Sequence, residues 1–219
     1  MTPVVGALVL FGGQQVVDRW KINDVVISGD LTVWDAESIA SQVSWLQGQG
    51  FFTTDLRGAY DNVLAMPLIK EVQVKKRWPG YVEITVSEDI PMAVWNGNQL
   101  IGISGDLMAI PERLNVDNLT LIRGDIEYMD IAIKNYRVLQ QALAPTGTNV
   151  STLSMTNTGS LELDLNNQWH VSLGRKNIEA RARRLLKVMS RFPAEQVAEV
   201  DLRYGKGAAI RWQPAQEKG

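Results

Sequence analysis

The chain has 219 residues, 45% of them hydrophobic, which suits one large domain or two small ones. Its formal net charge of −2 gives no overall attraction to nucleic acid or to an anionic surface, so any such role would need a local basic patch. The sequence contains no cysteine, which excludes disulfide bonds, thiol nucleophiles and sulfur-ligated zinc.

An apolar run without charge occupies residues 3–11. It is too short to cross a bilayer, since a spanning helix needs about 20 residues, and it lacks the basic stretch and cleavage site of a signal peptide. It is either the outer half of a transmembrane helix or an apolar leader. Trp20 suits a membrane interface, where aromatic rings collect. We therefore expect residues 1–20 to be a membrane anchor with its juxtamembrane segment.

Residues 21–90 predict the order strand, helix, helix, strand, strand. The β-branched segment 22–28 indicates the first strand, and Asp35 is a residue type that caps helices. The first helix has an apolar face made by Ala36, Ile39, Ala40, Val43 and Leu46. The second begins at Thr54 or Asp55 and has an apolar side made by Leu56, Tyr60, Val63 and Leu64.

A β-hairpin is predicted over residues 67–88, PLIKEVQVKKRWPGYVEITVSE. Apolar and polar residues alternate on both sides of a central turn, which marks strands with one solvated face. Pro79-Gly80 has the residue types of a type II turn, with proline at the second position of the turn and glycine at the third.

A domain boundary is predicted at Ile90-Pro91, because the pattern beyond it changes to short strands. The second domain is expected to span residues 91–212, with a flexible tail at 213–219. Strands are expected at 92–95, 99–103, 107–110, 150–155, 161–165, 169–173 and 208–212, the last paired with the segment before Tyr204. Helices are expected at 128–143 and 178–191, with buried stripes that include Ala132, Tyr136, Leu139, Leu143, Ala182 and Leu185.

Residue types that carry catalysis are sparse. His170 is the only histidine, and no G-x-S-x-G sequence accompanies it, so it is interpreted as an ordinary strand residue. Neither an EF-hand loop nor an H-E-x-x-H helix is present. Carboxylates that meet only in space remain open. The sequence therefore predicts no enzyme and no cofactor.

Cationic residues gather in two places, Lys75–Arg77 and the helix at 178–191 with its preceding Arg175-Lys176. The helix could meet an anionic partner. The favoured interpretation is a solvated helix face. Nucleic acid is disfavoured as a partner, because the chain as a whole is acidic and that face has no interleaved aromatic residues.

The segment DLRYGKGAAIRW, residues 201–212, predicts a hairpin with a terminal strand. A terminal strand often lies at a sheet edge, where unpaired backbone groups invite another strand. Tyr204 and Trp212 could then anchor a partner. The alternative is a plain closing hairpin with both rings in the core, and the residues alone do not separate the two.

These segments together resemble the FtsQ/DivIB family of bacterial cell-division proteins over nearly the whole chain. The first half resembles a POTRA domain through VVISGD, the residue 67–88 hairpin and IPMAVWN. The second half is similar to the family's β domain through LELDLNNQWHVSLGR and VDLRYGKGAAIRW. The resemblance implies an α+β fold, a β-α-α-β-β POTRA domain followed by a mostly antiparallel β-sheet domain with two helices.

The resemblance also implies a non-catalytic divisome scaffold. It would be anchored in the inner membrane by a single helix, with its domains in the periplasm at the division septum. The implied partners are FtsB and FtsL, with FtsK and other divisome proteins reached through the POTRA domain. The implied partner-binding residues are Arg203, Tyr204, Gly207, Ala208, Ala209, Ile210 and Trp212.

This sequence departs from the family pattern in two places. Lys206 stands where small residues often precede the glycine, and Thr158-Gly159-Ser160 stands where some relatives carry arginines. Contact at Lys206 is therefore in doubt, and an ion pair before the Leu161 strand is not expected. The runner-up function is a POTRA-type chaperone or receptor module for outer-membrane protein assembly or secretion.

Overall fold

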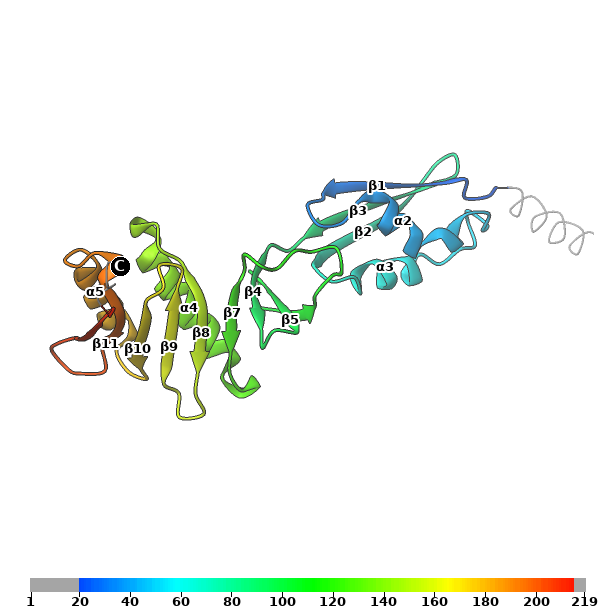
Figure 1. Cartoon of the computed structure of the whole chain (residues 1–219). Helices are drawn as coiled ribbons and strands as arrows, with labels where there is room; N and C mark the ends of the chain where they lie inside the picture. The colour runs from blue at the N-terminus through cyan, green and yellow to red at the C-terminus, as the bar shows by residue number, and fades with distance from the viewer. Residues whose placement is uncertain (1–19, 215–219) are drawn as a thin grey trace, which may run out of the picture. The chain divides into compact units, whose positions relative to one another are not determined.

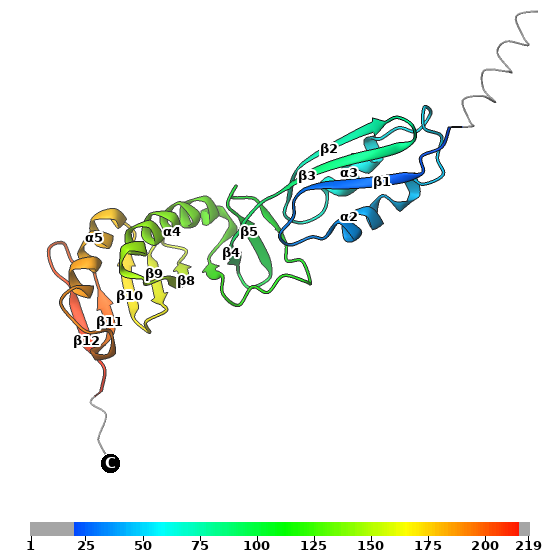
Figure 2. The ribbon, with the colours of Figure 1, turned by 90° about the horizontal axis from the view of Figure 1, so that it is seen from above.

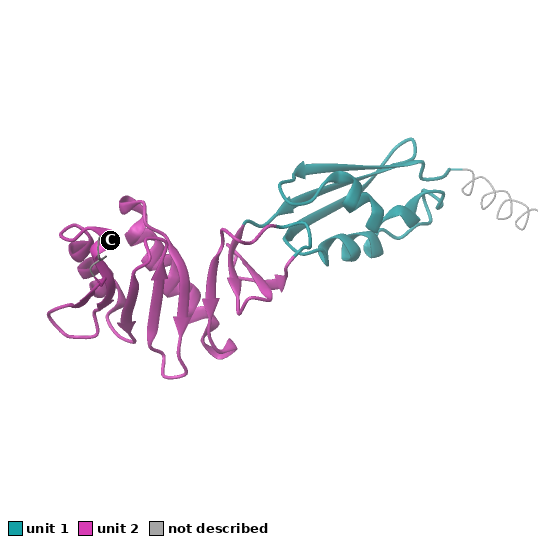
Figure 3. Cartoon of the chain, in the orientation of Figure 1, with its two compact units in different colours: residues 1–90, 111–114 teal, residues 91–110, 115–219 magenta. Residues whose placement is uncertain are grey.

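The computed structural model describes residues 20–214. The predicted anchor, except for Trp20, and residues 215–219 of the predicted tail lie outside the described residues. Among residues 20–214, none of the helices is both long enough and apolar enough to cross a bilayer. The chain divides into two compact units, which are coloured separately in Figure 3. Unit 1 comprises residues 20–90 with 111–114, and unit 2 comprises residues 91–110 with 115–214.

Unit 1 has the β-α-α-β-β order expected of a POTRA domain. Its elements are β1 (Asp24–Asp30), α2 (Ala36–Gln42), α3 (Arg57–Leu64), β2 (Ile69–Arg77) and β3 (Tyr81–Glu88), with a 3-10 turn at Ser44–Leu46 after α2. The sheet order is β1-β3-β2, in which β1 is parallel and β2 antiparallel to β3. Both helices lie on one face of this sheet (Figure 1), where they bury Val82, Ile84 and Val86 of β3.

The helix starts in unit 1 follow from local capping. Asp35 caps α2 by accepting a hydrogen bond from the Ser38 backbone N–H at 2.7 Å. Hydrogen bonds from Ser38, and after them the Arg113 guanidinium, lower the pKa of Asp35 to about 2. Helix α3 begins at Arg57, three residues later than its earliest predicted start, because Asp55 accepts from the Arg57 N–H in the preceding turn.

The predicted apolar side of α3 was wrong in part. Val63 is buried, but Tyr60 and Leu64 are 39% and 37% exposed. The residue that packs with Val63 is Ala59, four positions before it, so the buried stripe is narrow and small. A small alanine carries little hydrophobic signal in a sequence pattern, which is why the larger side chains were favoured.

The predicted type II turn in the β2–β3 hairpin was also wrong. The turn is closed by the Gly80 N–H donating to the Arg77 carbonyl at 3.1 Å, which makes Pro79 its third residue instead of its second. The Trp78–Pro79 peptide is cis, as proline at the third position of a type VI turn requires. The hairpin itself is confirmed, with Arg77 paired to Tyr81.

The loop between β1 and α2 is held by one carboxylate. Glu88, at the end of β3, accepts from the backbone N–H groups of Thr32, Val33 and Trp34 at 2.8 to 2.9 Å, and from the Thr32 hydroxyl at 2.7 Å. Burial acts to raise the pKa of Glu88, but these hydrogen bonds outweigh it and hold the pKa below its ordinary value.

Unit 2 is built on one nine-stranded sheet with the order β12-β11-β10-β9-β8-β7-β4-β5-β6. Its strands are β4 (Pro91–Trp95), β5 (Gln99–Gly102), β6 (Leu107–Ala109), β7 (Thr120–Arg123), β8 (Val150–Met155), β9 (Leu161–Leu165), β10 (His170–Gly174), β11 (Val197–Asp201) and β12 (Ala209–Trp212). Most neighbouring pairs are antiparallel, but β4–β7, β7–β8 and β10–β11 are parallel. The α+β class predicted for the chain is confirmed.

Helices α4 (Met129–Leu143) and α5 (Ile178–Met189) cover one face of this sheet, as Figure 2 shows. The predicted stripes are confirmed at Ala132, Tyr136, Leu139, Leu143, Ala182 and Leu185, all of which are buried. They pack against inward residues of the central strands, among them Leu163 and Val171. Strand β7 was missed by sequence analysis.

Residues 111–114, which lie between β6 and β7 in the sequence, belong to unit 1. Arg113 forms an ion pair with Asp35 at 2.9 Å, and its guanidinium lies over the Trp34 ring at 5.2 Å. The Trp34 indole N–H in turn donates to the Pro67 carbonyl at 2.7 Å. The start of α2 is therefore stabilised by a loop that is distant in sequence.

Candidate partner-binding site

Strand β12 is the last strand of the sheet of unit 2. It pairs only with β11 among residues 20–214, in the register Asp201 to Ala209, Val200 to Ile210 and Val197 to Trp212. The other side of β12 carries no strand from the described part of the chain. Backbone groups on that side can therefore accept a further strand.

The side chains of β12 alternate between the two faces of the sheet. Ile210 and the preceding Ala208 are half-buried and pack against the core of unit 2. Ala209 and Arg211 are exposed on the opposite face, where Arg211 forms an ion pair with Glu199 of β11 at 2.9 Å. At the end of β12 the Trp212 ring meets the Phe192 ring edge-to-face at 5.2 Å, and Trp212 remains 49% exposed.

The loop before β12 is shaped by two arginines of α5. Arg184 donates to the carbonyls of Tyr204 and Gly207 at 2.7 and 2.8 Å. Arg181 donates to the carbonyls of Arg203, at 3.0 Å, and Leu173. The expectation of a merely solvated helix face was therefore wrong for these two residues, since both hold the backbone of the loop. Tyr204 itself is 61% exposed.

Arg203 is engaged within the chain. Asp201, at the end of β11, accepts from the Arg203 backbone N–H at 2.9 Å and from its guanidinium at 2.6 to 3.0 Å. The hydrogen bonds from the Arg203 side chain lower the pKa of Asp201 and raise that of Arg203, with the opposite charges adding to both shifts. Arg203 thus presents an ion-paired guanidinium at the base of the loop.

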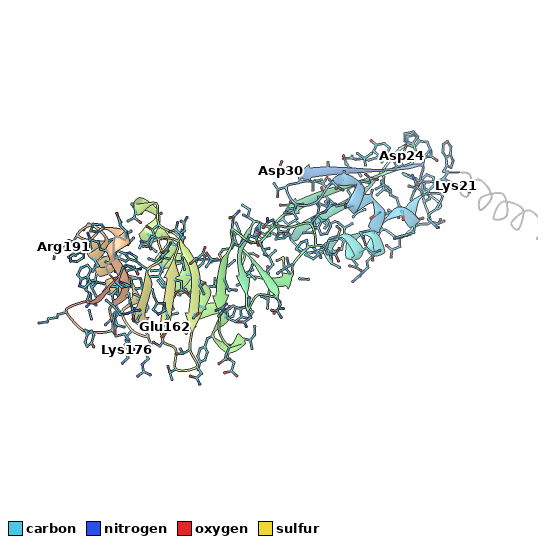
Figure 4. All side chains as sticks on the ribbon, in the orientation of Figure 1. Lys21, Asp24, Asp30, Glu162, Lys176 and Arg191 are labelled. Carbon is cyan, nitrogen blue, oxygen red and sulfur yellow. The ribbon has the colours of Figure 1, made fainter. Side chains whose placement is uncertain are left out.

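A groove of about 730 Å³ runs between α5 and residues 205–210. None of its described lining residues is acidic, and five are cationic: Arg183, Arg184, Lys187, Arg191 and Lys206. Figure 4 labels Lys176 and Arg191, which flank the two ends of α5. Val188, Phe192 and Ile210 provide an apolar floor. The groove suits a segment that carries both apolar and acidic side chains.

His170 has a partner that the sequence did not indicate. Its Nδ1 lies 2.7 Å from the Asp164 carboxylate, because the two residues face each other across β9 and β10. Neither residue lines the groove beside α5. Within residues 20–214 no three histidine, aspartate or glutamate side chains gather closely enough to hold a metal ion.

The structure brings the sequence-predicted site residues to one end of unit 2. Arg203, Tyr204 and Gly207 belong to the loop, and the others belong to β12 or directly precede it. Sequence analysis missed Phe192 as the ring beside Trp212 and the arginines of α5 as loop supports. The cationic run in α5 was noticed, but nothing in its spacing told which residues faced the loop.

Comparisons with known proteins agree with this architecture. Residues 20–89 match the family described as POTRA domain, FtsQ-type, and residues 93–203 match the family described as Cell division protein FtsQ/DivIB, C-terminal. The second match ends at Arg203, so most of the candidate site lies beyond it.

Similar proteins include three cell division proteins FtsQ. That of Xanthomonas campestris is 30% identical over 210 residues, which cover 95% of this chain and 74% of the relative. That of Coxiella burnetii is 31% identical, covering 78% of this chain and 71% of the relative. That of Escherichia coli is 28% identical, covering 97% and 80%.

The fold and these matches define a POTRA unit joined to a β-sheet unit in a bacterial cell-division protein. The chain belongs to the FtsQ/DivIB family. Its role therefore lies in the divisome, within a family whose members act through protein–protein interactions and are generally non-catalytic.

Proposed function

We propose that this chain is a non-catalytic scaffold that binds FtsB and FtsL in the periplasm and links early and late division proteins. The partner adds a strand to the outer side of β12, and its side chains enter the groove beside α5. The main supporting observation is that, within residues 20–214, β12 pairs with a strand on one side only. Tyr204, in the loop before β12, and Trp212, at its end, are both exposed. A stable interface of this kind buries about 1,200 to 2,000 Å² in total.

The residues assigned to this interface share a place on the loop or on β12: Arg203, Tyr204, Gly207, Ala208, Ala209, Ile210 and Trp212. Ala209 is small, so a partner backbone can approach β12 closely. Tyr204 is an exposed aromatic on a loop that Arg184 holds in place, which suits an anchor residue. Arg203, already paired with Asp201, offers its remaining donors to an acidic partner residue.

The same proposal places the chain in the inner membrane by a single helix, with both units in the periplasm at the septum. The POTRA unit then contributes to recruitment, in part through FtsK. The family match favours this role over that of a chaperone for outer-membrane proteins, since one POTRA match is followed directly by the FtsQ/DivIB C-terminal match.

Titration with the periplasmic segment of FtsB tests the site. Tyr204→Ala is expected to weaken binding by about 2 kcal/mol or more, because truncation of an exposed anchor removes a central contact without disturbing the core. Tyr60→Ala is the matched control, since Tyr60 is a partly exposed tyrosine of unit 1. Equal affinities for the wild type and Tyr204→Ala would show that the assigned edge is wrong.

Hydrogen exchange tests the mode of binding. Strand addition is expected to slow exchange of backbone amides in β12 that do not pair with β11, while amides of β9 and β10 in the interior of the sheet stay unchanged. Binding without new protection in β12 would exclude strand addition, even if Tyr204 proved to be an anchor.

A further inference from the structure

Four aromatic rings form a cluster at one end of unit 1, which we call the tip cluster: Trp20, Phe51, Phe52 and Trp78. The Trp20 and Trp78 centroids are 4.5 Å apart, and Phe51 and Phe52 lie 6.0 and 6.2 Å from Trp78. Phe51 is buried, whereas Trp20, Phe52 and Trp78 are 40%, 54% and 58% exposed. The cluster thus presents three large rings to its surroundings.

The tip cluster is assembled from three segments that the backbone holds together. The Phe51 N–H donates to the Trp20 carbonyl at 2.7 Å, and the Asn23 N–H donates to the Gly80 carbonyl at 2.7 Å. A Cβ at Gly80 would lie 2.7 Å from the Lys21 carbonyl, so this close approach requires glycine. The rings are therefore presented by ordered backbone and are not scattered along a loose loop.

Basic side chains surround these rings. Lys21 is exposed directly after Trp20, and Lys76 donates to the Phe52 carbonyl at 3.4 Å with its ammonium 6.0 Å from the Phe51 centroid. Arg77, beside Trp78, is already paired with Glu83 at 2.8 Å. In the sequence, Asp18 precedes Trp20 by two residues, Asp24 follows Lys21 by three, and Asp55 follows Phe52 by three. Figure 4 shows Lys21 at one end of unit 1, with Asp30 at the far end of β1.

We propose that the tip cluster is a membrane-contact surface, which inserts Trp20, Phe52 and Trp78 into the headgroup region of an anionic bilayer. Tryptophan is the residue type that collects at this depth. Lysines around exposed rings add attraction to anionic lipid headgroups. Residues 1–17 contain no charged side chain, and Asp18 and Arg19 stand between them and Trp20 in the sequence. Residue types and sequence continuity therefore favour a lipid surface over a protein partner.

This surface lies in unit 1 and is separate from β12, so its test does not depend on the proposed binding of FtsB. The full chain is mixed with vesicles of phosphatidylethanolamine and phosphatidylglycerol, and bound protein is measured by co-sedimentation. Phe52→Ser/Trp78→Ser is expected to lower the partition coefficient about tenfold. The variant lacks two half-exposed rings whose transfer from water into the bilayer would favour binding. The control Trp45→Ser/Tyr60→Ser removes two partly exposed rings outside the cluster and is expected to bind like the wild type.

Charge is tested separately. Lys21→Gln/Lys76→Gln is expected to lower partition about fivefold per lysine on the anionic vesicles at low salt, and to leave partition into neutral phosphatidylcholine vesicles unchanged. Residues 1–19 are the same in every variant, so their contribution cancels in each comparison. Equal binding by the aromatic variant and its control would overturn the proposal.

A probe measurement covers the case in which the aromatic variant misfolds. The chain has no cysteine, so the single thiol of Phe52→Cys can be labelled with one environment-sensitive fluorophore. Its emission is expected to rise and shift to shorter wavelength on addition of anionic vesicles, while the same probe at Trp45→Cys stays unchanged. A probe at position 52 that remains in water in the presence of bound vesicles would also overturn the proposal.

Discussion

At the scale of single residues, several ionised side chains hold the backbone of loops. Glu88 accepts hydrogen bonds from three backbone N–H groups before α2, and Arg184 donates to two backbone carbonyls before β12. Each side chain therefore provides hydrogen-bond partners for several backbone groups of a loop, which would otherwise need water as a partner. Charged residues of this kind appear in a sequence as ordinary surface positions, and only their contacts reveal their role.

Glu88→Gln is expected to destabilise unit 1 by about 1 to 2 kcal/mol at pH 7, since the carboxylate is replaced by a group with one acceptor oxygen. The folded pKa of Glu88 is lowered, so its stabilisation is fully present above the ordinary value of 4.5 and is lost as the pH falls through the folded pKa. Chemical denaturation at a series of pH values should show the two proteins converging in acid. A difference that persists unchanged to low pH would contradict this account.

At the scale of elements, α5 has two tasks. Ala182, Leu185 and Val188 are buried against the sheet, while Arg181 and Arg184 bind the loop before β12. The helix therefore couples the core of unit 2 to the position of Tyr204. A regular helix is suited to this, because its side chains are fixed relative to one another.

Arg184→Ala is expected to loosen the loop without unfolding unit 2, because the carbonyls of Tyr204 and Gly207 lose their donor but remain accessible to water. Amide exchange in residues 203–208 should become faster, and binding of the FtsB segment should weaken, while the melting temperature changes little. Arg183→Ala is the control for the exchange measurement, since Arg183 lines the groove but, among the described residues, makes no hydrogen bond to a carbonyl of the loop. Unchanged exchange in Arg184→Ala would refute the supporting role.

At the scale of the whole molecule, charge is distributed unevenly. The chain carries a net charge of −2, yet the groove beside α5 is lined by five cationic and no acidic described residues. Such local concentration attracts an acidic partner even when net charge does not. Salt screens exposed charges over about 10 Å at 0.1 M ionic strength, so this attraction should depend on ionic strength.

The association rate of the FtsB segment is therefore expected to fall as the salt concentration is raised. Arg183→Gln/Lys187→Gln should lower the association rate at low salt severalfold and flatten its salt dependence, with a smaller effect on dissociation. Lys70→Gln, an exposed change on β2 of unit 1, is the control. A salt dependence identical in all three proteins, measured by stopped-flow fluorescence, would show that the groove does not steer the partner.

Periodicity alone predicted most of the elements and both core stripes of the unit 2 helices. The stripe of α4, from Ala132 to Leu143, is buried as expected because a period near 3.6 places those side chains on one face of a helix. The same argument failed on α3, where small Ala59 packs inward and Tyr60 and Leu64 stay exposed. Periodicity also gave no indication of β7.

The amino-acid sequence by itself determined the α+β class, the β2–β3 hairpin, the helix faces of unit 2 and the kind of residues near the C-terminus. Each of these features depends on residues that are close together in the chain. The tertiary structure alone decided the order of the nine strands, the place of β12 at the end of the sheet, the pairing of Arg181 and Arg184 with the loop, and the tip cluster. These features join residues far apart in sequence, and contacts of that kind depend on how whole elements pack, which local patterns do not encode.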